Sequence, residues 1–471
     1  MNRKKFLTFF LFFWIFDIAA QEVKICTQES FLNLDPHLAS SYPETQSFNG
    51  LVYETVVKYN PKSKTLVPFL IDNWTSFSQD KIYKLVFGKD ISFYSSKGDR
   101  KYQLDANDFL FSFELYWDKV KSGKVDDPYI LKNIQKIELA ENQKEVLIHL
   151  VKSDPFFMQR LVGKMGIVLS KKYYDELKQK NKLVDFYKNP VGTGAYGVKK
   201  FTAKDLELIR KNNYHFGKVE VASIQFVNTP DLIAAEKYLR NGLCDIVPGL
   251  DIKDKELQSH HNEGEIALSL NLNPRSGLMR VLKEIPLWEM INLNALARTL
   301  NPATQSVGQF VPNGSSLKDK AQINMVYSFT KAQQAIKKYH LKQITIFFTP
   351  EVRAEIANMK TFLKYLKESF HELELEITMG DAKTADIVLQ ATHLNGMNEA
   401  PLFAYFDLWP TNGEFTKEWF TGLAKNLGTE SYRYPLGFIN TSHATRKQIS
   451  RFYPYHSKNY DLTLLQVSNI N

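Results

Sequence analysis

The alternation of apolar and polar positions predicts an α/β protein. Apolar residues alternate with polar ones over 83–87, as in a half-buried strand, and recur three and four apart over 357–370, as in an amphipathic helix. Residues 219–250 read as strand, helix and strand. A further helix is predicted to begin near Asp105 and Asp108, because carboxylates accept hydrogen bonds from the free N–H groups of a first turn. Capping explains these two aspartates better than acid–base chemistry does.

The first twenty residues are typical of a secretory signal peptide. Three basic residues among the first five precede an apolar run over 6–16, and small residues follow at Ala19 and Ala20. A membrane-spanning helix, the alternative, needs about 20 apolar residues, whereas Asp17 ends this run. We therefore expect cleavage near Ala20 and export to the periplasm.

Composition and charge narrow the function classes. The 471-residue chain carries a formal charge of +9, and removal of 1–20, with three basic residues and one acidic residue, would leave +7. Lysines are scattered and the protein is expected to be exported, so a nucleic-acid partner is not expected. Common nucleophile and metalloprotease motifs are missing, and the ten histidines show no i, i+4 pairing. We expect no enzyme activity, no metal and no cofactor.

The segment 189–197, Asn-Pro-Val-Gly-Thr-Gly-Ala-Tyr-Gly, is the most informative stretch of the chain. Pro190 restricts one φ angle, and the glycines allow positive φ or a close approach of backbone. A phosphate-binding loop would continue into Lys-Ser/Thr or into a helix with a further spaced glycine. Here extended runs follow instead, at 198–201 and 206–212. The segment is therefore interpreted as a turn before strands.

This turn and the residues after it, "NPVGTGAYGVKKF…LELIRKNNYHFG", resemble the interdomain signature of the extracytoplasmic solute-binding proteins of family 5, the periplasmic dipeptide- and oligopeptide-binding proteins of ABC importers. Ala195 replaces the usual proline and His215 the usual tryptophan. Other matches include "LDPH" at 34–37, and they follow in order along most of the mature chain. The resemblance is weak over 380–430, where the third domain is shortened.

The resemblance implies an α/β fold with two lobes: a type II periplasmic binding protein of the three-domain, peptide-binding class, with mixed sheets and a ligand cleft between the lobes. In such a protein Pro190, Gly192, Thr193 and Gly194 would form the interdomain hinge or turn. The implied segments are 1–20 as signal peptide, 21–53 as the first part of domain I, 54–187 as domain II, 188–265 as the second part of domain I, 266–430 as the ligand lobe or domain III, and 431–471 as the C-terminal return to domain I.

Ligand contacts carried over from the family give a mixed result. Arg353 stands where an arginine binds the C-terminal carboxylate of short peptides, although a solvated helix arginine beside two glutamates is an equal alternative. The loop of Ser40, Ser41 and Tyr42 would touch peptide backbone, or be a plain surface loop. The aspartate that binds the α-amino group in relatives is missing. His393 and Asn395 are the polar candidates near its position.

The two cysteines of the mature chain are Cys26 and Cys244. In an oxidising compartment an even count favours one disulfide, with two separate buried thiols as the alternative. The resemblance implies the bridge, since some dipeptide-binding relatives carry cysteines in the corresponding segments. Cys26 is not preceded by the pattern that marks lipid attachment, which favours a freely soluble periplasmic protein.

Two functional hypotheses follow from the resemblance. The first is a non-enzymatic, monomeric periplasmic protein that captures a peptide or small-molecule ligand and hands it to an ABC permease in the inner membrane. The second is a transport-inactive relative that senses a signal or binds a protein partner, favoured by the shortened third domain and the missing amine-binding aspartate. A hydrolase is a remote third.

Overall fold

The computed structural model places most of the chain after residue 20. The residues it describes are 21–28, 34–38, 48, 50–60, 65–125, 127–202, 205–300, 310–311, 315, 317, 319–321, 326–349, 352, 359–393, 416–426, 432–452, 454–456, 459–460, 463 and 465–467.

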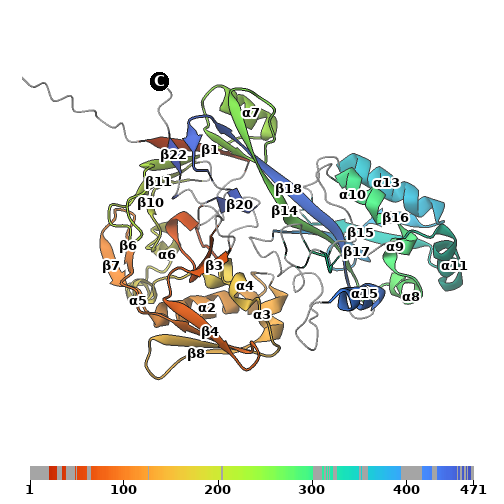
Figure 1. The fold of residues 1–471 in the computed structure, drawn as a ribbon, viewed down its shortest axis with the longest axis horizontal. Coiled ribbons are helices and arrows are strands. Elements are labelled where there is room, and N and C mark those ends of the chain that lie inside the picture. The colour runs from red at the N-terminus through yellow and green to blue at the C-terminus, as the bar shows by residue number, and fades with distance from the viewer. Residues whose placement is uncertain are drawn as a thin grey trace, which may run out of the picture.

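Figure 1 shows two bodies side by side, joined by two long strands. One ten-stranded sheet runs through both bodies in the order β10-β11-β12-β1-β13-β18-β14-β17-β15-β16. Its strands are β10 (Tyr196–Phe201), β11 (Asp205–Arg210), β12 (Ser223–Asn228), β1 (Glu22–Thr27), β13 (Ile246–Pro248), β18 (Arg433–Arg446), β14 (Leu257–Leu272), β17 (Ile387–His393), β15 (Gln343–Phe348) and β16 (Glu376–Met379).

Strands β14 and β18 connect the two bodies, and their pairing changes on the way. They pair regularly from Leu257↔Arg446 to Asn262↔Thr441, and pairing resumes at Ile266↔Ile439. Three residues of β14 thus face one residue of β18, which breaks the ladder as a bulge does. We call the described residues 21–262 and 441–467 the first lobe, and those from 266 to 439 the second lobe.

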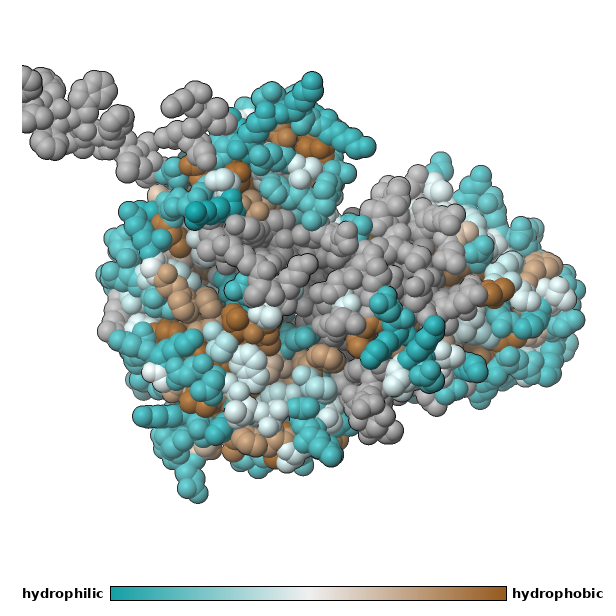
Figure 2. All heavy atoms as spheres, viewed as in Figure 1, coloured by the Kyte–Doolittle hydropathy of each residue, from teal (hydrophilic) through white to brown (hydrophobic). Residues whose placement is uncertain are grey.

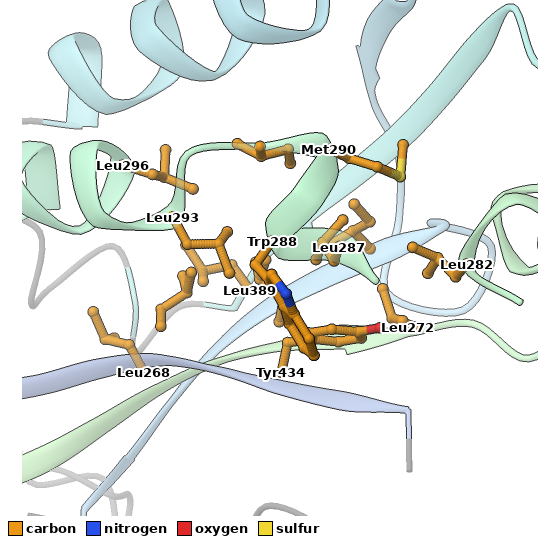
Figure 3. Packing of buried hydrophobic residues seen from close by; sticks show 14 of the residues in the cluster. Leu268, Leu272, Leu282, Leu287, Trp288, Met290, Leu293, Leu296, Leu389 and Tyr434 are labelled. Carbon is orange, nitrogen blue, oxygen red and sulfur yellow. The ribbon is translucent and has the colours of Figure 1, made fainter. Parts of the chain in front are cut away.

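The second lobe has one apolar core, built where helices cover one face of its sheet. Figure 3 shows Leu268, Leu389 and Tyr434 of the strands meeting Trp288 and other helix residues. The ring centroids of Trp288 and Tyr434 lie 5.9 Å apart. The helices among the described residues of this lobe are α8 (Leu278–Leu282), α9 (Leu287–Met290), α10 (Leu293–Leu300), α11 (Phe329–Tyr339), α13 (Met359–Glu372) and α15 (Lys417–Asn426).

The first lobe has a second, four-stranded sheet, in the order β4-β5-β9-β8, with a core of its own. Its strands are β4 (Asn73–Phe77), β5 (Ile82–Val86), β9 (Glu145–Leu150) and β8 (Ile134–Leu139). Short strand pairs accompany it: β2 (Val57–Asn60) with β3 (Thr65–Pro68), and β6 (Ser92–Tyr94) with β7 (Arg100–Gln103). The helices are α2 (Ala106–Lys121), α3 (Pro128–Asn133), α4 (Phe157–Arg160), α5 (Lys171–Gln179), α6 (Asp185–Lys188) and α7 (Leu232–Arg240).

Helix α2 confirms the capping interpretation of the two aspartates. The Asp105 side chain accepts hydrogen bonds from the backbone N–H groups of Asn107 and Asp108. In return, the Asp108 side chain accepts one from the backbone N–H of Asp105 at 3.0 Å. Both carboxyl groups therefore serve the helix start, as in a capping box.

Hydrophilic side chains dominate the visible face of both lobes, with apolar ones scattered between them (Figure 2). Among the exposed apolar residues are Val184, 69% exposed, and Ile233, 82% exposed. Scattered single residues of this kind are normal on a protein surface. Within the described residues, no helix has the length and apolarity to cross a membrane.

Candidate functional site

The turn predicted at 189–197 lies inside the first lobe, pressed against the chain at 51–54. A Cβ atom on Gly192 would lie 2.0 Å from the carbonyl oxygen of Val52, and one on Gly194 would lie 2.2 Å from that of Leu51. Thr193 is fully buried and Pro190 is buried. Neither Gly192 nor Gly194 has a positive φ. Of the two reasons for glycine considered from the sequence, close backbone approach is therefore the one that applies.

Hydrogen bonds hold this turn to its neighbours. Gly192 and Tyr94 exchange two backbone bonds, of 3.0 and 3.1 Å, and the N–H of Gly194 donates to the carbonyl of Val52 at 3.1 Å. The turn thereby joins the β6–β7 pair to β10, the first strand of the ten-stranded sheet.

A buried group of polar side chains lies beneath the turn. Lys211 follows β11 and donates from Nζ to the carbonyl oxygen of Gly192 at 3.0 Å. The hydroxyl of Tyr214 donates to Oε1 of Glu54 at 2.5 Å, and Nε2 of His215 lies 3.4 Å from Oε2 of the same carboxyl. Three segments distant in sequence therefore meet at one carboxyl group and one ammonium group.

Burial governs the titration of this group. Desolvation lowers the pKa of Lys211 to about 7, against the opposing pull of Glu54, and raises the pKa of the Glu54 carboxyl. Burial and the nearby charges of Lys211 and Lys89 lower the pKa of His215 to about 4, so the imidazole is neutral at pH 7. The cluster is suited to fastening the junction, since its hydrogen bonds tie the turn and the chain at Glu54 to the segment after β11.

A second anchor fixes the loop that leads toward Ser40. Both carboxylate oxygens of Asp35 accept from Nζ of Lys119 on α2, at 2.8 and 2.7 Å. The same Nζ donates to the hydroxyl of Tyr187 at 3.0 Å and lies 3.3 Å from Nδ1 of His37. The predicted contact residues Ser40, Ser41 and Tyr42 themselves lie outside the described residues. The structure thus describes the support of that loop.

In the second lobe, the ends of β15 and β17 form a common edge. The two strands are parallel, and the backbone N–H of Thr349, just after β15, donates to the carbonyl of Leu389 at 3.1 Å. His393 is the last residue of β17 and pairs through its backbone with Ile266 of β14. The segments that continue toward Arg353 and Asn395 leave from this edge, although both residues, and the side chain of His393, lie outside the described part.

Uncharged polar side chains occupy the sheet face opposite the core near this edge. The amide of Asn271 on β14 donates to Oε1 of Gln390 on β17, and Ser269 donates to Oδ1 of Asn271 at 3.4 Å. Sequence reasoning did not single out these residues. The sequence pattern that could have identified them is the alternation over 268–272. The apolar residues Leu268, Leu270 and Leu272 point to the core, and the polar residues between them do not.

Cys26 and Cys244 form a disulfide, as the resemblance implied. Cys26 belongs to β1 and Cys244 follows α7, with Cα atoms 5.7 Å apart, and both residues are fully buried. The bridge lies within the first lobe. Among the described residues, no group of three or more His, Cys, Asp or Glu side chains is placed to hold a metal ion.

The chain is similar to bacterial binding proteins in both sequence and fold. Residues 65–283 match the family model of the bacterial extracellular solute-binding proteins, family 5 middle. The probable di/tripeptide-binding protein 5 of Pseudomonas aeruginosa (strain UCBPP-PA14) is 25% identical over 264 residues, which are 53% of this chain and 49% of that protein. The chain therefore spans about half the length of this curated relative.

Solved structures share the whole architecture. The periplasmic binding protein DppA of Helicobacter pylori, in complex with peptide STSA, has a TM-score of 0.73 and 17% identity, covering 95% of this chain and 98% of its own. The dipeptide-binding protein of Pseudoalteromonas sp. SM9913, in complex with Met-Leu, has a TM-score of 0.74 and 14% identity, covering 95% and 100%. At this identity the similarity shows the fold: the two-lobed architecture of periplasmic binding proteins.

Proposed function

We propose that this chain, whose residues 65–283 match the family 5 model of the bacterial extracellular solute-binding proteins, captures a peptide between its lobes and delivers it to an ABC permease. The observation that carries the proposal is that β14 and β18 pass together from one lobe to the other. Two strands with a broken register connect the lobes, an arrangement that permits closure around a ligand as hinged binding proteins close.

The edge formed by β15 and β17 supplies the second-lobe side of the proposed site. Ligands of α/β sheets bind beyond the carboxyl ends of parallel strands, and both strands end there. Within this proposal Arg353 takes an anionic group, such as a peptide carboxylate, and His393 and Asn395 stand in for the missing amine-binding aspartate. Ser40, Ser41 and Tyr42 contact the peptide backbone from the first lobe, beyond the Asp35–Lys119 anchor.

The names of relatives support a peptide as the solute class. The Pseudomonas relative is named a di/tripeptide-binding protein, and the two solved structures are described with a peptide and with Met-Leu. In this proposal the protein is a soluble monomer in the periplasm, and its signal peptide is cleaved near Ala20. It has no enzyme activity, and its partner is the permease in the inner membrane.

Native mass spectrometry of the protein isolated from its own periplasm tests the proposal. We expect a mass increment that is released on denaturation and that is identified as one or a few short peptides. Isothermal titration of the emptied protein with di-, tri- and tetrapeptides should then show saturable binding. A protein that carries no peptide and gives no heat with any of these lengths would contradict peptide capture.

A further inference from the structure

Two adjacent phenylalanines in the first lobe pack into different lobes. Phe157, the first residue of α4, is fully buried in the core of the four-stranded region, with its ring centroid 4.9 Å from that of Tyr83. Phe156 is half-buried and packs instead against the apolar core of the second lobe. Residues of that core run from Ala267 to Ile439, so the contact crosses between the lobes.

The backbone that carries Phe156 is firmly held. Oδ1 of the buried Asp154 accepts the N–H of Phe156 at 3.0 Å, and its backbone carbonyl accepts the N–H of Phe157 at 3.0 Å. Oδ2 accepts from the hydroxyl of Tyr129 at 2.6 Å and from Nε of Arg160 at 3.0 Å. A side chain on a backbone fixed by so many bonds loses little further entropy when it makes a contact.

The position of this segment suits a contact that forms as the lobes close. Figure 1 shows α4 on the side of the first lobe that faces the second lobe, away from the crossing strands β14 and β18. A contact far from a hinge is made or broken by a small rotation about it, whereas the packing of Phe157 inside one lobe is unaffected by that rotation.

We propose that Phe156 is a positioning residue for lobe closure. Its ring is an apolar projection whose burial against the second lobe favours the closed arrangement, while Asp154 and Phe157 hold it on the first lobe. Removing the ring removes apolar burial from the closed form alone, so the equilibrium shifts toward open forms. The inference builds on the lobe closure proposed above, but its test needs no ligand.

The test is a distance measurement between the lobes in Phe156→Ala. Spectroscopic probes are attached through unnatural amino acids at the exposed positions Lys178 on α5 and Lys367 on α13, which leaves the disulfide intact. We expect the ratio of closed to open molecules to fall about three- to tenfold, on the scale of a partly buried aromatic contact. Phe156→Leu should recover part of the closed population.

Two further variants separate closure from folding. Phe77→Ala removes an aromatic ring that is 46% exposed on β4 and should leave the distances unchanged. Phe157→Ala should lower the melting temperature strongly, whereas Phe156→Ala should leave it within about 2 °C of the wild type.

Identical distance distributions for wild type, Phe156→Ala and Phe77→Ala would overturn the proposal. Adding a tripeptide mixture to the labelled wild type tests the proposed function separately. If the peptides shift no distance there, peptide capture fails, while the ligand-free comparison still decides the role of Phe156.

Discussion

The side-chain nitrogen of Lys211 donates a 3.0 Å hydrogen bond to the carbonyl oxygen of Gly192, so a buried lysine fastens the turn at the junction within the first lobe. Lys211 is 3% exposed, and its charge is balanced electrostatically by Glu54. A lysine is seldom buried unless it is paired. This bond links the end of β11 to a turn nineteen residues earlier in the chain.

Lys211→Met should destabilise the protein by about 2–4 kcal/mol, because Glu54 loses its balancing charge and the Gly192 carbonyl loses its donor. Urea unfolding followed by circular dichroism measures the change. The matched control is Lys200→Met, at a lysine 55% exposed whose partner Asp205 is also exposed. Equal unfolding free energies for the two variants would show that the buried bond contributes nothing.

Gly192→Ala should cost about 2–4 kcal/mol or abolish folding, since the added methyl group meets backbone at 2.0 Å and overpacks a rigid junction. Gly50→Ala is the control, because a Cβ there meets no atom within 4 Å. Thermal melts of both variants check the prediction. A normal melting temperature for Gly192→Ala would mean that the turn is not as closely packed as described.

Stability should fall on acidification through His215. Its pKa is about 4 in the folded protein and about 6.5 when unfolded, so the unfolded state binds more protons between these values. The stabilisation is complete above pH 6.5 and is lost as the pH falls toward 4, by about 1–3 kcal/mol after allowance for partial exposure.

The variant His215→Phe isolates this effect. Its unfolding free energy should decline less than that of the wild type between pH 7 and 4, although His37, whose pKa burial also lowers, still contributes to both proteins. Parallel pH profiles would rule out a contribution from His215.

The Cys26–Cys244 bridge should contribute up to about 5 kcal/mol, because it closes a loop of 218 residues in the unfolded chain. The variant Cys26→Ala/Cys244→Ala should unfold at lower urea concentration. Exported wild-type protein, denatured without reductant, should show no thiol that reacts with a maleimide. Two reactive thiols per chain would contradict the bridge.

Arg353→Ala should weaken binding of a free-acid peptide by more than tenfold, on the scale of a lost charge-assisted hydrogen bond. Binding of the same peptide with an amidated C-terminus should change little. Titration calorimetry with both peptides measures the two affinities, and Arg280→Ala, at an exposed arginine of α8, is the control. If the wild type binds acid and amide equally, Arg353 does not read the carboxylate.

What the sequence by itself determined is local or carried by a motif. The capping box of Asp105 and Asp108 was predictable because its bonds span three residues. The turn at 189–197 followed from Pro190 and the glycines around it, whereas the disulfide between Cys26 and Cys244 was implied by the resemblance, and the structure contains both. The alternation at 83–87 predicted a strand that the structure has as β5, Ile82–Val86.

Only the tertiary structure decided which residues meet across long separations. Lys211 stands in the polar run Arg210-Lys211-Asn212-Asn213, typical of a solvated surface, yet it is buried next to Gly192 and near Glu54. Phe156 and Phe157 are identical and adjacent, yet they pack into different lobes. Local patterns record preferences over a few residues, whereas burial and charge pairing depend on which distant segments the fold brings together. The environment of a side chain is therefore set by the whole chain.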